Sequence, residues 1–105
     1  MTAKEFILNL PSKVNTDAIE GLETNFHFDI EGDHGGQFTV SIKDQEVNSE
    51  EGLVGDPSCT VKVKDENLMK LLKGELNPMM AMMTGKVKIS NPGEMMKYAK
   101  IFGLM

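Results

Sequence analysis

The 105-residue sequence contains no arginine and only one cysteine, Cys59. Arginine is the side chain best suited to gripping phosphate with two parallel hydrogen bonds, so its absence argues against a nucleic-acid partner. A single cysteine excludes a disulfide within the chain and a metal site made of several cysteines. Cys59 alternates in phase with Val61 and Val63, so we expect a buried, unreactive thiol.

Long hydrophobic runs are also missing. No apolar run approaches the roughly 18 residues that would cross a bilayer. Neither a signal-peptide pattern nor a peroxisomal C-terminal tripeptide is present, and we therefore expect a cytoplasmic location. The length suits one domain with a single hydrophobic core, covering residues 1–105.

Charge is distributed unevenly within a net charge of −5. Residues 1–56 carry three lysines and twelve acidic residues, a balance of −9, whereas residues 57–105 carry eight lysines and four acidic residues, a balance of +4. The acidic half again argues against nucleic acid. The lysines of the second half either keep a surface solvated, which is the commoner case, or favour transient contact with an anionic membrane. The candidates for such contact are Lys62, Lys64, Lys86 and Lys88.

Methionine is absent from residues 2–68 and frequent after them. Four methionines lie between Asn77-Pro78, which favours the start of a helix, and Gly85, which favours its end. At about 100° per residue they cover an arc of roughly 160°, with Ala81 at its back. Each could be ordinary core, but the width of the arc predicts a second apolar neighbour, either a lipid-like ligand or a partner protein.

Alternating apolar and polar residues predict strands near residues 24–30, 37–42, 59–64 and 86–90, and a weaker strand is expected around residues 46–48. Helical signals cover residues 4–10, 12–22, 65–73, 77–84 and 91–102. The expected N-caps are Asp65 and Asn91, Gly74 is expected to end the helix that starts at Asp65, and Glu94 is placed to complete a capping box with Asn91. This order predicts an α+β fold with one five-stranded, mostly antiparallel sheet and helices packed on one face. We expect four antiparallel strands before the first C-terminal helix. The strand residues predicted to face the helices are Phe26, Phe28, Phe38, Val40, Val61, Val63, Val87 and Ile89. The residues predicted to face water are Thr39, Ser41, Thr60, Lys62, Lys86 and Lys88.

The candidate metal-ligating residues gather near the first hairpin. His27, Asp29, Glu31, Asp33 and His34 have suitable side chains, but an exposed polar strand face has the same pattern. Neither histidine has a serine or cysteine partner in a known catalytic motif. We therefore expect no metal, no cofactor and no catalytic residue.

A longer motif runs from Gly74 to Ile89, with the pattern G-x-L-N-P-x-x-A-x-x-x-G-K-x-K-I. Together with the similar stretch from Phe26 to Phe38, it resembles the sterol carrier protein family, in its stand-alone prokaryotic form. The family often has tryptophan at the position of Phe38. The resemblance covers roughly residues 6–102 and implies a sheet backed by helices around an apolar tunnel. Its ligands would be fatty acids, fatty acyl-CoA, sterol-like molecules or phospholipids.

The apolar helix faces and the resemblance together predict carriage of an apolar lipid inside the cell. The alternative is a non-catalytic accessory module that docks its methionine-rich face on a partner enzyme and presents an apolar substrate. The oligomeric state stays open. The residues predicted to bind the ligand are Phe26, Phe28, Phe38, Leu68, Leu72, Met79, Met80, Met83, Met95, Ala99 and Phe102.

Overall fold

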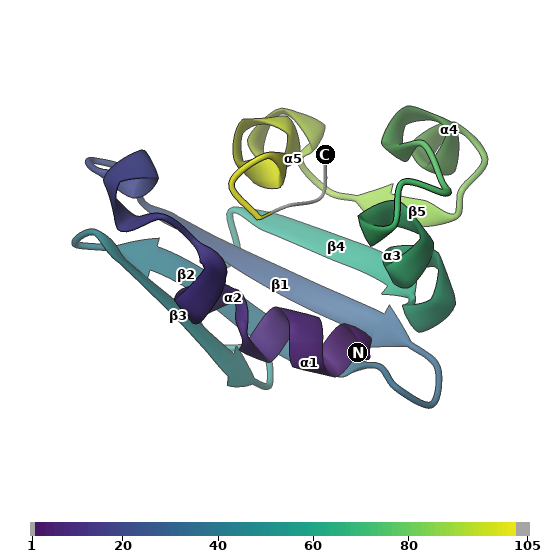
Figure 1. Ribbon diagram of the computed structural model, residues 1–105, viewed down its shortest axis with the longest axis horizontal. Coiled ribbons are helices and arrows are strands. Elements are labelled where there is room, and N and C mark those ends of the chain that lie inside the picture. The colour runs from purple at the N-terminus through teal and green to yellow at the C-terminus, as the bar shows by residue number, and fades with distance from the viewer. Residues whose placement is uncertain (1, 103–105) are drawn as a thin grey trace.

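Within residues 2–102, which the computed structural model describes, five α-helices and one 3-10 helix accompany a five-stranded sheet (Figure 1). The α+β class predicted from the sequence is confirmed. In chain order the elements are α1 (Ala3–Leu8), α2 (Leu10–Lys13), the 3-10 helix η1 (Thr16–Ile19), β1 (Thr24–Glu31), β2 (Gly36–Lys43), β3 (Glu46–Glu51), β4 (Cys59–Lys64), α3 (Asp65–Leu72), α4 (Pro78–Met83), β5 (Val87–Ile89) and α5 (Pro92–Ala99).

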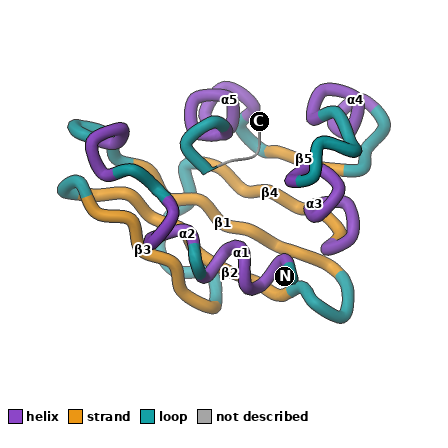
Figure 2. The backbone as a smooth tube through the Cα atoms, viewed as in Figure 1, coloured by secondary structure: helices purple, strands orange, loops and turns teal. Residues whose placement is uncertain are grey.

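The strands lie in the order β3-β2-β1-β4-β5. Three of the four strand pairs are antiparallel, as predicted, but β4 runs parallel to β1. The expectation of four antiparallel strands before α3 is therefore wrong. After β3 the chain crosses over β2 and β1. The next strand, β4, pairs with the side of β1 away from β2 and runs in the same direction as β1. Figure 2 shows this crossing as a loop between two strands.

The crossing segment, residues 52–58, lies against the face of the sheet opposite to the helices. The Thr39 hydroxyl donates to the Gly52 carbonyl at 2.7 Å and accepts from the Val54 amide at 2.9 Å. His27 Nε2 lies 2.9 Å from the Val54 carbonyl oxygen. Thr39 and His27 are consequently buried, and the prediction that Thr39 faces water is wrong.

Two groups of helices share the apolar face of the sheet. The N-terminal cover consists of α1, α2 and η1, which pack against β2 and β3. The C-terminal cover consists of α3, α4 and α5, which pack against β4 and β5. Figure 1 shows α1 and α2 in front of the sheet, and α4 and α5 above β5 and β4. The two covers meet the same sheet over different strands, and they contact each other where α1 packs against α3.

Candidate functional site

An apolar cavity of about 50 Å³ lies between the C-terminal cover and the sheet. Its floor comes from the inward-facing residues of β1, β4 and β5, where strand alternation turns every second side chain towards the helices. All twelve lining residues are apolar, so this site offers no side-chain charge or hydrogen bond to a ligand. They are Phe28, Val61, Val63, Leu68, Leu71, Pro78, Met82, Val87, Ile89, Met95, Met96 and Ala99.

Helix α3 supplies one wall of the cavity through Leu68 and Leu71. Gly74 ends the helix with a φ of +75°, and the Glu75 amide donates to the Lys70 carbonyl at 2.9 Å. This pair of features is the Schellman C-cap that the glycine predicted. The predicted N-cap at Asp65 is wrong, because Asp65 is already the first helical residue.

Helix α4, which has only six residues, forms another wall of the cavity through Pro78 and Met82. The Asn77 side chain accepts from the amides of Met79 and Met80, as its N-cap position predicts. The expected orientation of the helix is wrong, because Ala81 is fully buried and faces the interior. Asn77 and the Gly85 stop fix the ends of the helix but not its rotation. Close packing on the sheet leaves room for a methyl group at position 81. Met79, Met80 and Met83 point outward, whereas Met82 reaches the cavity.

Helix α5 supplies Met95, Met96 and Ala99 to the cavity. The Asn91 side chain accepts from the Glu94 amide at 3.2 Å, which confirms the predicted N-cap. The Glu94 carboxylate does not complete the expected capping box. It accepts a hydrogen bond from the Thr24 hydroxyl at 2.9 Å and so ties α5 to the start of β1.

Aromatic side chains close the α5 end of the site. Phe26 and Phe102 meet edge to face with ring centroids 5.2 Å apart, and Tyr98 packs on both. The Tyr98 hydroxyl donates to the Glu23 carbonyl at 3.3 Å. Burial, and to a smaller extent the Glu94 charge, raises the pKa of Tyr98, so this hydroxyl stays neutral at physiological pH. The cluster is structural in character.

The structure brings together only part of the predicted site. Phe28, Leu68, Met95 and Ala99 line the cavity. Phe26, Phe38 and Phe102 are buried in the core beside it, and Leu72 is half-buried. Met79, Met80 and Met83 are exposed on the outside of α4 and do not line the cavity. Their contact with a bound ligand stays a prediction.

Among the helical residues that line the cavity, the sequence prediction missed Leu71, Pro78, Met82 and Met96. Helical periodicity alone placed Met82 at the edge of the arc and Met96 beside the buried face of α5. Ala81 is the one small residue of α4, and a small residue allows a helix to approach a sheet closely. If Ala81 is placed against the sheet for this reason, its neighbour Met82 is expected near the cavity. The β-strand residues Val61, Val63, Val87 and Ile89 were predicted to face the helices, which their alternation already required.

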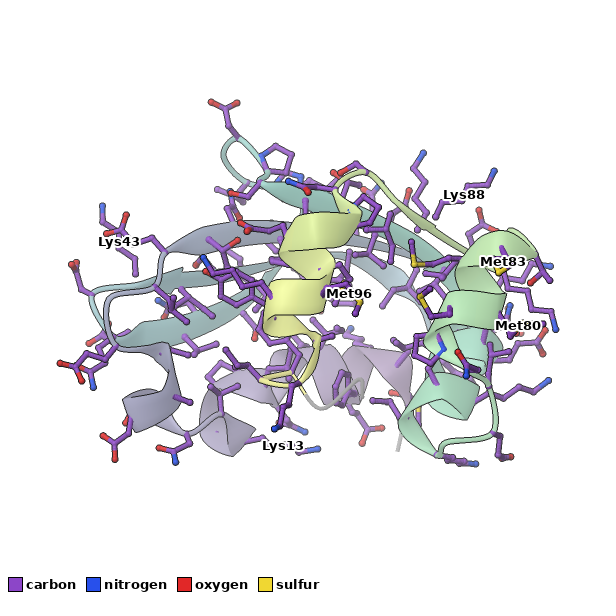
Figure 3. The ribbon with its side chains drawn as sticks, turned by 90° about the horizontal axis from the view of Figure 1, so that it is seen from above. Lys13, Lys43, Met80, Met83, Lys88 and Met96 are labelled. Atoms are coloured by element: carbon purple, nitrogen blue, oxygen red, sulfur yellow. The ribbon has the colours of Figure 1, made fainter. Side chains whose placement is uncertain are left out.

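The candidate membrane-contact lysines lie on the opposite face of β4 and β5. Lys62 and Lys88 are directly opposite each other in the antiparallel pair. Lys62, Lys64, Lys86 and Lys88 border a hollow of about 420 Å³ that also includes Glu31 and Asn67. Figure 3 shows Lys88 extending away from the sheet near α4.

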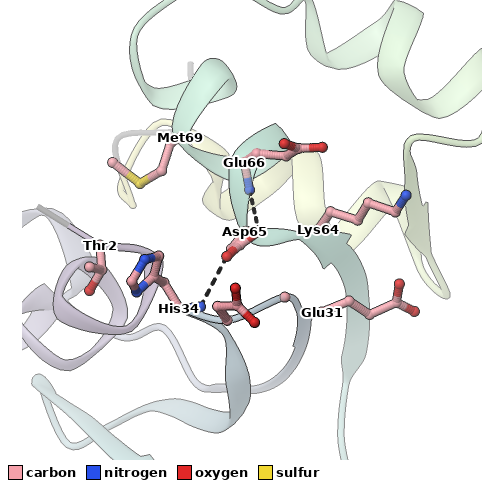
Figure 4. Close-up of a pocket in the computed structure, with 9 residues that line it drawn as sticks. Thr2, Glu31, His34, Lys64, Asp65, Glu66 and Met69 are labelled. Atoms are coloured by element: carbon pink, nitrogen blue, oxygen red, sulfur yellow. Dashed lines mark hydrogen bonds between the residues drawn. The ribbon is translucent and has the colours of Figure 1, made fainter.

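The residues around the first hairpin do not form a metal site. Within residues 2–102, no group of three or more histidine, cysteine, aspartate or glutamate side chains is arranged to hold a metal ion. His34 lies at the hollow drawn in Figure 4, whereas His27 is buried under the crossing segment.

Asp65 joins the first hairpin to α3 (Figure 4). Its carboxylate accepts from the amides of His34, at 3.0 Å, and Glu66, at 2.7 Å. These two hydrogen bonds hold the pKa of Asp65 below its usual range, and the bond from the His34 amide has the larger effect. Gly32 packs beside this carboxylate with a φ of +116°, where a side chain would collide with it.

Cys59 is buried, as predicted, and its sulfur lies 3.6 Å from the Asn91 carbonyl oxygen. Burial raises the pKa of the thiol, which keeps it protonated and a poor nucleophile. Among residues 2–102, no helix is both long enough and apolar enough to cross a membrane.

Comparison with known proteins identifies the fold and its setting in larger proteins. The SCP-2 sterol transfer family matches residues 4–105. The chain is 28% identical over 93 residues to hydroxysteroid dehydrogenase-like protein 2 of Bos taurus, covering 88% of this chain but 22% of that relative. The chain therefore spans about a fifth of the length of that curated relative.

Two solved structures share the fold. Palmitated SCP2L2 of Aedes aegypti is 22% identical with a TM-score of 0.73, and the match covers 97% of this chain and 95% of that protein. The sec-alkylsulfatase Pisa1 of Pseudomonas sp. is 21% identical with a TM-score of 0.79, covering 100% of this chain and 16% of the sulfatase. At these identities the likeness concerns the fold alone.

Proposed function

This chain belongs to the SCP-2 sterol transfer family of lipid-binding and lipid-transfer domains, and we propose that it binds and carries an apolar lipid in the cavity beneath its C-terminal cover. The observation that carries the proposal is the lining of that cavity, in which every one of the twelve residues is apolar. Transfer of hydrocarbon from water into such a site is favourable at about 25 cal/mol per Å² of buried apolar area. The cavity therefore suits the hydrocarbon part of a ligand.

The candidate ligands are fatty acids, fatty acyl-CoA, sterol-like molecules and phospholipids. Each combines a large apolar part with a polar group that the cavity cannot satisfy. A buried polar group without a hydrogen-bond partner is unfavourable by about 1–3 kcal/mol. We therefore place the polar group at the surface, beside the half-exposed Met96, where the lining reaches solvent.

Binding requires the cavity to widen into the proposed tunnel. Ligand pockets commonly measure roughly 300–1,000 Å³, against about 50 Å³ here. Met82, Met95 and Met96 form the adjustable part of the wall, because unbranched methionine side chains change rotamer readily. Helix α4 is short and packs mainly against β5, an edge strand of three residues. Its outward displacement is the simplest way to admit a chain.

The variant Ala99→Leu tests this proposal. Leucine is as good a helix former as alanine within a few tenths of a kcal/mol, so the change mainly adds volume to the cavity. We expect it to weaken binding of a fluorescent fatty acid at least about tenfold, equivalent to about 1.4 kcal/mol. Ala3→Leu in α1, away from the cavity, is the matched control and should leave the affinity of the folded protein unchanged.

Native mass spectrometry of the purified protein provides an independent measurement. Carriage predicts a lipid adduct that solvent extraction releases and that Ala99→Leu reduces. Equal fatty-acid affinity in the wild type and in Ala99→Leu, together with a ligand-free mass, would contradict the proposal.

A second candidate function is a non-catalytic accessory module that presents an apolar substrate to a partner enzyme. The observation in its favour is the setting of this fold in larger proteins, since the match covers only 16% of the sulfatase and 22% of the curated relative. Presentation differs from free carriage in requiring a defined partner surface. A loaded protein whose ligand leaves only when the enzyme is added would favour presentation over carriage. A cytoplasmic location is part of both proposals, and the single unpaired Cys59 suits a reducing compartment.

A further inference from the structure

Helix α4 turns three methionine side chains towards solvent. Met79, Met80 and Met83 are 60%, 54% and 78% exposed, whereas Ala81 on the opposite side is fully buried. At about 100° per residue the three methionines span an arc of roughly 100°, with Met83 between the other two. The central residue of the arc is thus also the most exposed one. We call these three side chains the methionine triad, and Figure 3 labels two of them, Met80 and Met83, on α4.

The spacing of the methionine triad brings its sulfur atoms within reach of one another. Met83 is four residues from Met79 and three from Met80, and residues at these spacings have Cβ atoms roughly 5–6 Å apart on a helix surface. A methionine side chain has three rotatable bonds, so the three sulfurs can converge on one point outside the helix without a change in the backbone. Within α4, which contains only proline, alanine and methionine, the sulfurs are the only side-chain atoms that can bind a metal ion.

The neighbouring sequence offers no ligand set for a harder metal ion. Residues 76–93 include no aspartate, glutamate, histidine or cysteine, the side chains on which sites for magnesium, calcium and zinc mainly depend. The polar residues that flank α4 are engaged in capping. The Asn77 oxygen accepts from the amides of Met79 and Met80, and the Thr84 hydroxyl donates to the Met80 carbonyl at 2.8 Å. Thioether sulfur is a soft ligand and selects copper(I).

We propose that the methionine triad is a surface site for copper(I), in which the three thioether sulfurs coordinate one ion. The ion keeps its oxidation state, so the step is ligation alone and needs no oxidant or reductant. The proposal departs from the sequence-based expectation of no metal, which weighed histidine, cysteine and acidic side chains. Among residues 2–102, no three side chains of those types are arranged to hold a metal ion, but methionine lies outside that group. The site is distinct from the lipid cavity and does not rest on the proposed function.

The first test is competition for copper(I) with the chelator bicinchoninate in the absence of oxygen. We expect the wild type to bind one ion per chain. The double variant Met79→Leu with Met83→Leu keeps the helix apolar and favourable for helix formation but removes two of the three sulfurs, so it should weaken binding at least about tenfold. Met82→Leu, on the same helix but at the cavity wall, is the matched control and should bind like the wild type. Equal affinity in the double variant and the wild type would overturn the proposal.

The second test separates the methionine triad from the one thiol of the chain, because a thiolate is also a soft ligand. Cys59 is buried, and its raised pKa keeps it protonated, whereas a metal requires the thiolate. Cys59→Ala should therefore bind one copper(I) ion with the affinity of the wild type. A loss of binding in Cys59→Ala as large as that in the double variant would overturn the proposal, because the thiol would then be a ligand.

A third test uses the unaltered protein and silver(I), a soft and diamagnetic ion. With carbon-13 in the methionine methyl groups, titration with silver nitrate should shift the NMR signals of the methionine triad and leave those of Met82 and the buried Met95 in place. Zinc chloride should shift none of them, because zinc prefers nitrogen, oxygen and thiolate ligands. Equal shifts at Met95, or the same shifts with zinc, would overturn the proposal. Saturation at one silver ion per two chains, with a dimer in light scattering, would also overturn it.

Discussion

The two helical covers lie on the same face of one sheet and are built from different side chains. The N-terminal cover buries Ala3, Phe6, Ile7, Leu10 and Ile19, and no residue from 2 to 22 is an exposed large hydrophobic. The C-terminal cover contains all seven methionines of the described residues. Four of these are exposed, and a cavity lies beneath the cover.

This difference in side chains gives the N-terminal cover a rigid packing and the C-terminal cover an adaptable one. Branched and aromatic side chains have few rotamers and fill a core at high density, so they define one packing arrangement. Methionine has three rotatable side-chain bonds and adapts to irregular surroundings. The N-terminal cover therefore holds the sheet in shape while the C-terminal cover can change. The predictions below test this division, from the largest expected effect to the smallest.

The largest effect should come from Phe6→Ala in the N-terminal cover. Phe6 is buried against the sheet, and its ring lies 5.5 Å from the Lys13 ammonium. Removal of the ring leaves a cavity in rigid surroundings, so the free energy of unfolding should fall by about 3–5 kcal/mol. Urea denaturation measures this change. Fatty-acid affinity of the protein that remains folded should equal that of the wild type, and a specific loss of affinity would contradict the division.

The next effect compares added volume under the two covers. Ala3→Leu should lower the free energy of unfolding by about 1–3 kcal/mol, because Ala3 has no accessible surface and its neighbours must move. Ala99→Leu should lower it by less, since the new side chain grows into the cavity. Thermal denaturation of both variants without ligand gives the comparison. A greater loss at Ala99 would show that the C-terminal cover is the more rigid of the two.

Most of the fold follows from local sequence signals. Period-two alternation located β1, β2, β4 and β5, whereas only the start of β3 was predicted, from a weaker signal. Asn77, Asn91, Gly74 and Gly85 marked helix ends that the structure confirms. These signals act over a few residues, so they do not determine how distant segments meet. The parallel pairing of β1 with β4 depends on where the crossing segment passes, and Thr39 is buried for the same reason.

The site was less predictable than the fold because it depends on the rotation of one short helix. Helical periodicity grouped the methionines of α4 correctly but did not show which side meets the sheet. Four of the predicted residues, Phe28, Leu68, Met95 and Ala99, line the cavity because their elements are long enough for the buried face to be unambiguous. In α4 almost every residue is apolar, so hydrophobicity carries no information about direction.

A smaller effect should appear at Asp65, where the first hairpin meets the C-terminal cover. The folded pKa of Asp65 is lowered, so its carboxylate stabilises the protein above the unfolded pKa of about 3.9. This contribution is lost as the pH falls through the folded pKa. Asp65→Asn should therefore be less stable than the wild type at neutral pH, and the difference should shrink below about pH 4.

Thermal denaturation across the acidic range measures the Asp65 contribution. A stability difference between Asp65→Asn and the wild type that stays constant down to the lowest pH would show that the charge of Asp65 is not what joins the two parts.

The smallest effect should come from Met79→Gln combined with Met83→Gln. Both side chains are mostly exposed in the folded protein, so the substitutions change little apolar burial on folding, and the free energy of unfolding should shift by no more than about 0.5 kcal/mol per site. Met95→Gln is the contrasting variant, because this residue is buried and lines the cavity; an unpaired buried amide should destabilise it by about 1–3 kcal/mol. Urea denaturation distinguishes the two. If the exposed pair proved as destabilising as Met95→Gln, these methionines of α4 would contribute to the packing of the folded monomer, and their apolar character would not indicate an external ligand or partner.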